Sequence, residues 1–312
     1  MLYLTYNAGV WVDGLGSQYQ KIIGIITIAM KYNLEYVHTK ITIMDHVDSP
    51  EYIQKISDFF QIEYHYKSVN EYKYDEIYEE ENPTDDIIKT YVNKSINKNI
   101  LLKILKPHNI VFNNDTALLN KSIKILRTYL KMPILPYYNI PKSIKKIAIH
   151  VRRGDVDPDK YPDRFVPIEK YIDIVNKFNE IYPNSKIFII TEINEKNKNE
   201  FDIFNKYNNL KILANIDIIE SLGYMIKADI LVSCKSSFSY IPAIYNENTV
   251  YYIDFWHKPL DNWRNIDELL IEKFENIINI NNINIYLILI VLAIIIIIYI
   301  LFYLANKRAL SI

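Results

Sequence analysis

Apolar positions recur with two different spacings along the chain, and the spacing changes near residue 142. From residue 146 onward, short apolar runs alternate with longer segments in which apolar residues return every three or four positions. The short runs predict strands, and the longer segments predict helices. Strands are expected at 146–151, 186–191, 210–213, 229–233 and 250–253, and helices at 167–182, 201–207, 216–227 and 237–245. This strict alternation predicts a parallel sheet with helices on both faces.

The first half of the chain is less regular. Its opening predicts a short strand, a glycine-punctuated turn and a helix that continues through 22–30. Further strands are expected at 34–39 and 62–66, and helices at 49–60, 85–106 and 114–130. The acidic stretch 71–86 is interpreted as a solvated loop or an exposed helix face. Three prolines at 133, 136 and 141 interrupt the helical pattern. We place a domain boundary there, with domains at 1–141 and 142–280.

The C-terminal part is uniformly apolar. Residues 285–305 form a run of 21 residues without a charged or amide side chain. As a helix the run is about 30 Å long, enough to cross the hydrocarbon core of a bilayer. A buried core helix or an isoleucine-rich strand is the alternative. We expect a single-pass C-terminal membrane anchor, tethered through 258–284, with the preceding residues in the cytosol. Lys307 and Arg308 favour the opposite orientation under the positive-inside rule, so the orientation stays open.

Composition excludes several classes of function. The formal net charge is −1, which gives no basic face for broad nucleic-acid binding. Cys234 is the single cysteine, so the chain has no intramolecular disulfide. No P-loop and no GxSxG elbow is present. No metal-ligand spacing relates Cys234 to the histidines, among them His38, His46, His65 and His108, so no metal is expected.

The segment His150–Asp155 (HVRRGD) carries the strongest chemical signal. It follows the apolar run 147–149, so two adjacent guanidinium groups stand where a buried strand ends. In an open α/β sheet, ligands bind at the carboxyl ends of the strands. The planar fork of Arg152 or Arg153 matches phosphate oxygens, which indicates a bound diphosphate. The alternative is an internal ion-pair cluster in which the arginines pair with Asp155 or Asp157.

Two further segments could line the same crevice. The segment 233–243 (SCKSSFSYIPA) joins a strand to a helix. Ser236 and Ser237 there could cap the helix, or seat a phosphate at its positive end, and one serine can do each. In the segment 14–18 (GLGSQ), the glycine pair before a helix lets backbone approach a substrate, although a tight turn explains it equally well.

Together these three segments resemble the motifs of the GDP-fucose-dependent fucosyltransferases, the α-1,2, α-1,6 and protein O-fucosyltransferase group. That family has a G-x-G-N-Q turn, an H-x-R-R-x-D segment and a late acidic residue before S-S-F-S. This chain has GLGSQ, HVRRGD and Asp229 followed by SSFS, over about residues 9–265. The resemblance implies a GT-B type α/β fold, with two Rossmann-like domains facing across a cleft. It implies metal-independent, inverting transfer of fucose from GDP-fucose to a hydroxyl of a glycan-type acceptor.

The resemblance also assigns roles to residues. Arg152 would be the catalytic residue that stabilises the departing diphosphate. On the acceptor side, Ser17 stands where the family has asparagine. Donor binding would fall to His150, Arg153, Asp155, Ser236, Ser237, Phe238 and Ser239, and the acceptor side of the cleft to Gly14, Gly16, Ser17 and Gln18. The general base is not identified, and Glu192, after the strand 186–191, is a candidate cleft contact. Two alternatives stay open: a GT-B transferase for another nucleotide sugar, and a catalytically inactive, membrane-tethered binding domain.

Overall fold

The computed structural model describes residues 1–8, 12–47, 49–111 and 116–271. The chain divides into two compact units, Met1–Asn265 and Ile266–Ile312, and only residues 266–271 of the second are described. The helices and strands named below all lie in the first unit. The expected membrane helix at 285–305 lies outside the described residues. Among the residues that are described, no helix is long and apolar enough to cross a membrane.

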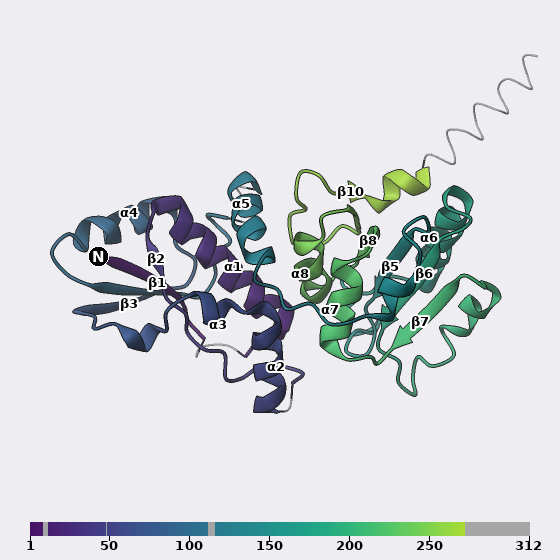
Figure 1. Ribbon diagram of the computed structural model, residues 1–312, viewed down its shortest axis with the longest axis horizontal. Coiled ribbons are helices and arrows are strands. Elements are labelled where there is room, and N and C mark those ends of the chain that lie inside the picture. Colours follow the sequence, from purple (N-terminus) through teal and green to yellow (C-terminus); the bar gives the residue numbers. More distant parts are fainter. Residues whose placement is uncertain (9–11, 48, 112–115, 272–312) are drawn as a thin grey trace, which may run out of the picture. The chain divides into compact units, whose positions relative to one another are not determined.

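The first sheet has four parallel strands in the order β2-β1-β4-β3. Its strands are β1 (Leu2–Tyr6), β2 (Glu35–Tyr36), β3 (Glu76–Glu80) and β4 (Ile100–Ile104). The helices of this half are α1 (Leu15–Tyr32), α2 (Pro50–Phe60), α3 (Ile62–His65), α4 (Asp85–Lys94) and α5 (Thr116–Arg127), with short 3-10 turns at Val69–Glu71 and Pro136–Asn139. Figure 1 shows α1, in purple, running along this sheet.

Three expectations for this half are wrong. The segment 62–66 is the short helix α3, because only Ile62 of its four residues is buried and no strand partner lies beside it. The helix expected over 85–106 ends at Lys94, and β4 follows as a central strand with both faces buried. The acidic stretch 71–86 contains the edge strand β3. Its glutamates face lysines: Glu76 pairs with Lys98, and the other pair is Glu79 with Lys103.

The second sheet follows the predicted alternation. It has six parallel strands in the order β10-β9-β8-β5-β6-β7. The strands are β5 (Lys146–Val151), β6 (Lys186–Thr191), β7 (Leu210–Ala214), β8 (Ile230–Ser233), β9 (Thr249–Tyr252) and β10 (Arg264–Asn265). The helices are α6 (Ile168–Ile181), α7 (Ile218–Ile226) and α8 (Ser237–Tyr245), and 202–206 is a 3-10 turn. The parallel α/β class is therefore confirmed.

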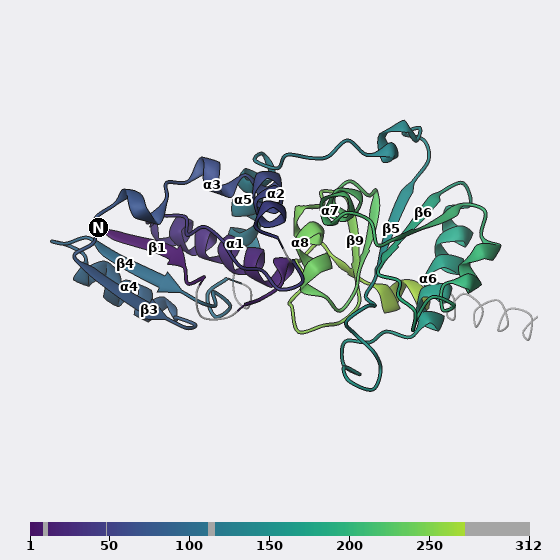
Figure 2. The ribbon, with the colours of Figure 1, turned by 90° about the horizontal axis from the view of Figure 1, so that it is seen from below.

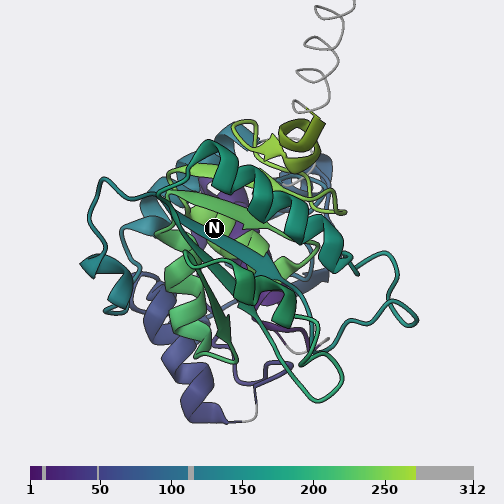
Figure 3. The same cartoon turned by 90° about the vertical axis from the view of Figure 1, so that its right-hand side faces the viewer.

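Helices cover both faces of the second sheet. Figures 1 and 2 show α6 on one face and α7 and α8 on the other, and Figure 3 shows the sheet from the side of α6. Side-chain caps start two of these helices: Asp217 accepts from the backbone of α7, and Ser236 does the same for α8. The caps fix where each crevice loop ends.

One continuous apolar core joins the two sheets. It includes Leu4 and Leu102 from the first sheet and Ala148 and Leu231 from the second. Helix α1 packs on α5 and also on α8. The N-terminal turn of α1 is thereby placed against the start of α8, at the carboxyl end of the second sheet. The proposed boundary at 141/142 separates the two sheets in sequence, but it remains a prediction as a domain boundary.

Candidate functional site

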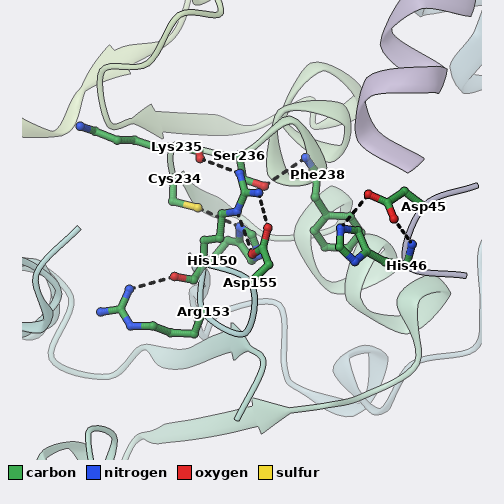
Figure 4. Close-up of polar contacts among 10 residues, drawn as sticks. Asp45, His46, His150, Arg153, Asp155, Cys234, Lys235, Ser236 and Phe238 are labelled. Atoms are coloured by element: carbon green, nitrogen blue, oxygen red, sulfur yellow. Dashed lines mark hydrogen bonds and ion pairs between the residues drawn. The ribbon is translucent and has the colours of Figure 1, made fainter. Parts of the chain in front are cut away.

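The carboxyl ends of β5, β6, β8 and β9 gather the side chains that the sequence singled out. Parallel strands end at the same edge, so their following loops share one crevice. Arg152 and Asp155 follow β5, Glu192 follows β6, Ser236 follows β8 and His257 follows β9. Figure 4 labels Asp155 and Ser236 of this group, with neighbouring residues and their polar contacts.

Arg152 is held at this edge by two partners. Its Nε and Nη2 donate to the carboxylate of Asp155 at 3.2 and 2.6 Å, and its Nη1 donates to the carbonyl of Lys235 at 3.3 Å. A guanidinium has five N–H groups. Within the described part of the chain, three of them have partners and two do not. The side chain is 18% exposed, so a partly accessible, oriented guanidinium lies beside the start of α8.

Asp155 is the carboxylate that orients Arg152. Desolvation alone raises its pKa, but the hydrogen bonds and the charge of Arg152 outweigh that effect and lower the pKa overall. The carboxylate is therefore ionised at neutral pH. It occupies Nε and Nη2 of the guanidinium and orients the remaining donors.

Arg153 occupies a different environment. Its side chain is 3% exposed and pairs with Glu200, with Nε donating to both carboxylate oxygens at 3.0 and 2.8 Å. Its other donors reach the carbonyls of Arg152 and Val166, and its guanidinium lies 4.3 Å from the ring centroid of Phe165. These contacts suit a residue that shapes the loop after β5. Donor binding by Arg153 stays a prediction.

His150 lies beneath the loop. Its Nδ1 is 3.0 Å from the sulfur of Cys234, and burial lowers the pKa of His150 to about 3. Ser239 is fully buried and bonds Ser233 at 3.1 Å. The ring of Phe238 lies 5.5 Å from that of His150. His150 and Ser239 therefore support the loops from inside, since neither side chain reaches the surface.

The two serines at the start of α8 make different contacts, and phosphate binding by Ser237 stays a prediction. Ser236 caps the helix by accepting from the backbone N–H of Phe238 at 3.2 Å. Ser237 is 2.8 Å from Nε2 of His257, whose Nδ1 is 3.0 Å from the amide nitrogen of Gln20 on α1. A polar chain thus links α8 to α1.

The glycine turn of the first half meets α8 directly. A Cβ built on Gly16 would lie 2.3 Å from the carbonyl carbon of Ser237, so glycine is required here by close backbone approach. Gly14 precedes α1 as its N-cap. Gln18 is buried, and its side-chain amide donates to the carbonyls of Asp13 and Ile43 at 2.7 and 2.9 Å.

Gln18 therefore ties two loops together, whereas Ser17 is partly exposed at the same turn. The structure thus brings Gly16 to the donor-side residues. An acceptor contact for any of these positions stays a prediction.

Sequence reasoning gave no catalytic role to Glu192 or His46, which both act electrostatically on the Arg152 site. Glu192 had been considered only as a cleft contact; its carboxylate lies over Gly154, whose φ of 87° and lack of a Cβ make room for it. Desolvation, and then the charge of Asp155, raise the pKa of Glu192. His46 comes from an irregular loop of the first half, and no periodicity marked it. Among the residues described, no cluster of His, Cys, Asp or Glu could hold a metal ion.

Comparisons with known proteins leave the family undetermined. No protein-family model matches the sequence, and no curated protein matches it either. POFUT1 in complex with GDP-fucose is a similar solved structure, at 11% identity over 81% of this chain and 98% of that chain, with a TM-score of 0.47.

Two other solved structures are similar to the same degree. E. coli heptosyltransferase WaaC with ADP shares 8% identity over 85% and 91% of the two chains, with a TM-score of 0.43. A UDP-N-acetylglucosamine 2-epimerase from Listeria monocytogenes, described as such only provisionally, shares 9% over 89% and 88%, with a TM-score of 0.48. At these identities and TM-scores the likenesses establish neither family nor substrate.

Proposed function

We propose that the chain is an inverting glycosyltransferase that moves fucose from GDP-fucose to a hydroxyl of a glycan-type acceptor. One observation carries the proposal. Arg152 stands at the carboxyl end of the central strand β5, oriented by Asp155, with two N–H groups that have no partner among the described residues. The resemblance of GLGSQ, HVRRGD and SSFS to fucosyltransferase motifs supports the choice of donor.

The chemistry explains why such a group would be needed. Breaking the sugar–phosphate bond leaves negative charge on an oxygen of the β-phosphate. A guanidinium already fixed in place, beside the positive end of a helix such as α8, stabilises that charge without reorganisation. Removing one donor of this kind costs about 3–4 kcal/mol, or about two to three decades in rate. Arg153 would act indirectly, by holding the loop through Glu200.

The test is nucleotide release by the full chain. GDP-fucose is supplied with and without a glycan acceptor, and GDP formation is followed in EDTA. Wild type should turn over, and Arg152→Ala should be slower by about 100- to 1000-fold. Arg264→Ala is the matched control, since Arg264 is an exposed arginine on β10. Equal rates for wild type and Arg152→Ala would contradict the proposal.

Another nucleotide sugar is the second candidate. Arg152 recognises phosphate, and phosphate is common to every nucleotide-sugar donor, so the observation that carries the proposal does not by itself select guanine or fucose. A UDP-sugar and an ADP-sugar in the same release assay separate the candidates. Release from one of these in place of GDP-fucose would keep the transferase and change its donor. No release from any of them would favour an inactive binding domain.

We also propose that residues 285–305 anchor the chain in a membrane, on the strength of their uncharged length alone. Full-length chain should float with vesicles and resist alkaline carbonate, and a chain ending at residue 284 should not. Protease protection of the first 284 residues in sealed vesicles would report the orientation. Complete solubility of the full chain would overturn the proposal.

A further inference from the structure

We propose that His46, held by Asp45, is the general base that takes the proton of the acceptor hydroxyl. This assignment rests on the proposed transferase function and adds the residue that function lacks. An inverting transfer needs a group to receive that proton as the new bond forms. The geometry points to His46 because its imidazole is fixed on one nitrogen and open on the other.

The carboxylate of Asp45 lies beside the imidazole of His46. One carboxylate oxygen of Asp45 lies 3.2 Å from Nε2 of His46, and the other accepts from the backbone N–H of His46 at 3.1 Å. In the tautomer that carries its proton on Nε2, the nitrogen that faces the carboxylate, Nδ1 has the lone pair. Nδ1 has no hydrogen-bond partner among the residues that the structure describes, and the side chain is 67% exposed. A carboxylate that orients a histidine in this way is the arrangement found in nucleophile-activating triads.

The backbone of His46 is strained. Its φ is 65°, in the left-handed region. Three other non-glycine residues in the described ranges share a positive φ, and each has an ordinary reason: Asn33 and Gln61 end helices, and Asn215 is an asparagine. His46 lies in a loop and does not end a helix, and histidine shares with asparagine a raised frequency in this region. Strain of this kind costs about 1–3 kcal/mol and gathers at functional sites.

The strained turn is anchored to the glycine turn before α1. Gly14 and Asp45 form a β-bridge, and the backbone N–H of Asp45 donates to the carbonyl of Asp13 at 3.0 Å. A Cβ on Gly14 would lie 3.7 Å from Cδ2 of His46. Figure 4 shows Asp45 and His46 on this separate segment, with both of their contacts dashed. The turn is therefore held where α1 begins, and α1 begins against α8.

His46 also lies within electrostatic reach of the Arg152 site. A positive charge on His46 lowers the pKa of Asp155, which bonds Arg152. Desolvation and Asp155 raise the pKa of Glu192, and the charges of His46 and Arg152 oppose that rise. The imidazole of His46 from the first half and the guanidinium of Arg152 from the second thus act on the same two carboxylates.

In the proposed step, the acceptor O–H proton moves to Nδ1 of His46, and the acceptor oxygen attacks the anomeric carbon of the nucleotide sugar. The bond from that carbon to the β-phosphate oxygen breaks, and its electron pair leaves with the nucleoside diphosphate, beside Arg152. Glu192 is the competing base, since it is a carboxylate at the same crevice. It lies over Gly154, on the same half as Arg152 and the proposed leaving group, which suits acceptor activation less well.

Chemical rescue tests the assignment. His46→Asn keeps a residue that tolerates positive φ and cannot accept the proton, and His46→Gly leaves room for added imidazole. Turnover of GDP-fucose should fall about 100- to 10,000-fold in both, and imidazole should restore a measurable part of it only in His46→Gly. GDP binding should be unchanged in both. His65→Asn is the matched control. His65 is the last residue of α3 and stacks on Tyr129, away from His46 and Asp45 in the sequence.

The outcomes distinguish a failure of the role proposed for His46 from a failure of the proposed transferase function. If wild type turns over but His46→Asn keeps its rate, or imidazole rescues nothing, His46 is only a loop residue. If Glu192→Gln abolishes turnover while His46→Asn does not, the base is Glu192. If wild type turns over no donor at all, the transferase function fails and this inference fails with it.

Discussion

Gly16→Ala is the change that tests the join between α1 and α8 most sharply. The new Cβ would lie 2.3 Å from the carbonyl carbon of Ser237 and 2.4 Å from the backbone nitrogen of Phe238. Ordinary van der Waals contact begins at 3.4 Å. The two helices would therefore have to separate by 1.1 Å, the difference between 3.4 and 2.3 Å. The obstacle is backbone, so no side-chain rotation can relieve it.

Two opposing terms set the size of the effect. In a helix, alanine in place of glycine stabilises by about 1 kcal/mol. Overpacking costs about 1–3 kcal/mol, and a backbone obstacle favours the upper end of that range. We expect a net loss of about 2 kcal/mol. For a unit of this size that lowers Tm by about 4–8 °C.

The assay is thermal unfolding, with Gly14→Ala as the matched control. A Cβ on Gly14 would meet nothing nearer than 3.7 Å, and the φ of Gly14 is −69°, so its loss should stay below about 1 kcal/mol. Without the α8 contact, Gly16→Ala would gain only helix propensity. A raised or unchanged Tm for Gly16→Ala would therefore refute the close approach of the two helices.

Three further predictions concern the same unit. Arg153→Met leaves Glu200 without its partner, and we expect about 3–5 kcal/mol of destabilisation; an unchanged urea midpoint would contradict it. Burial, reinforced by a neighbouring histidine, lowers the pKa of His257 from 6.5 to about 3. The unfolded chain then binds the proton first, so the free energy of unfolding should fall as pH drops from 6.5 towards 3, and His257→Gln should flatten that slope. Tyr52→Phe removes a hydroxyl that donates to Asp217 at 2.8 Å. The free energy of unfolding should fall by about 1–2 kcal/mol, measured by calorimetry, and an unchanged value would contradict a stabilising role for this hydrogen bond.

The second sheet could be predicted from sequence because its strands are buried on both faces. Parallel strands covered by helices appear as short, nearly continuous apolar runs, and 147–149 and 187–190 are such runs. The caps at Asp217 and Ser236 set the helix starts. Local chemistry and burial gave the same answer there, so the predicted bounds are within about two residues for the elements between 146 and 253, although 201–207 contains a 3-10 turn in place of the expected helix. The short strand β10 was not predicted.

The first sheet was harder to predict because tertiary pairing decided it. The run 100–105 is apolar enough for a helix or a strand, and its place between β1 and β3 makes it a strand. The edge strand β3 is acidic, and lysines from neighbouring segments balance it. Neither feature can be read from the local pattern, which is why 85–106 was expected to be one helix.

The candidate site could be proposed from sequence, but the contacts of its residues could not. Arg152 and Arg153 are adjacent and chemically identical, and only the fold pairs Arg153 with Glu200, 47 residues away. The pattern of 41–47 gave no sign of His46, whose interest comes from its φ and its contact with Asp45. The direction in which a side chain points and the extent of its burial distinguish such residues, and the spacing of residues in the sequence shows neither.

The most direct test of the central claim is binding of GDP and of guanosine to the full chain by calorimetry. If Arg152 holds the diphosphate, wild type binds GDP more tightly than guanosine, and Arg152→Ala removes most of that difference while leaving guanosine binding unchanged. A charge-assisted contact of this kind is worth about 1.5–3 kcal/mol, so GDP should weaken by about 10- to 150-fold. Equal GDP affinity in wild type and Arg152→Ala would contradict the claim.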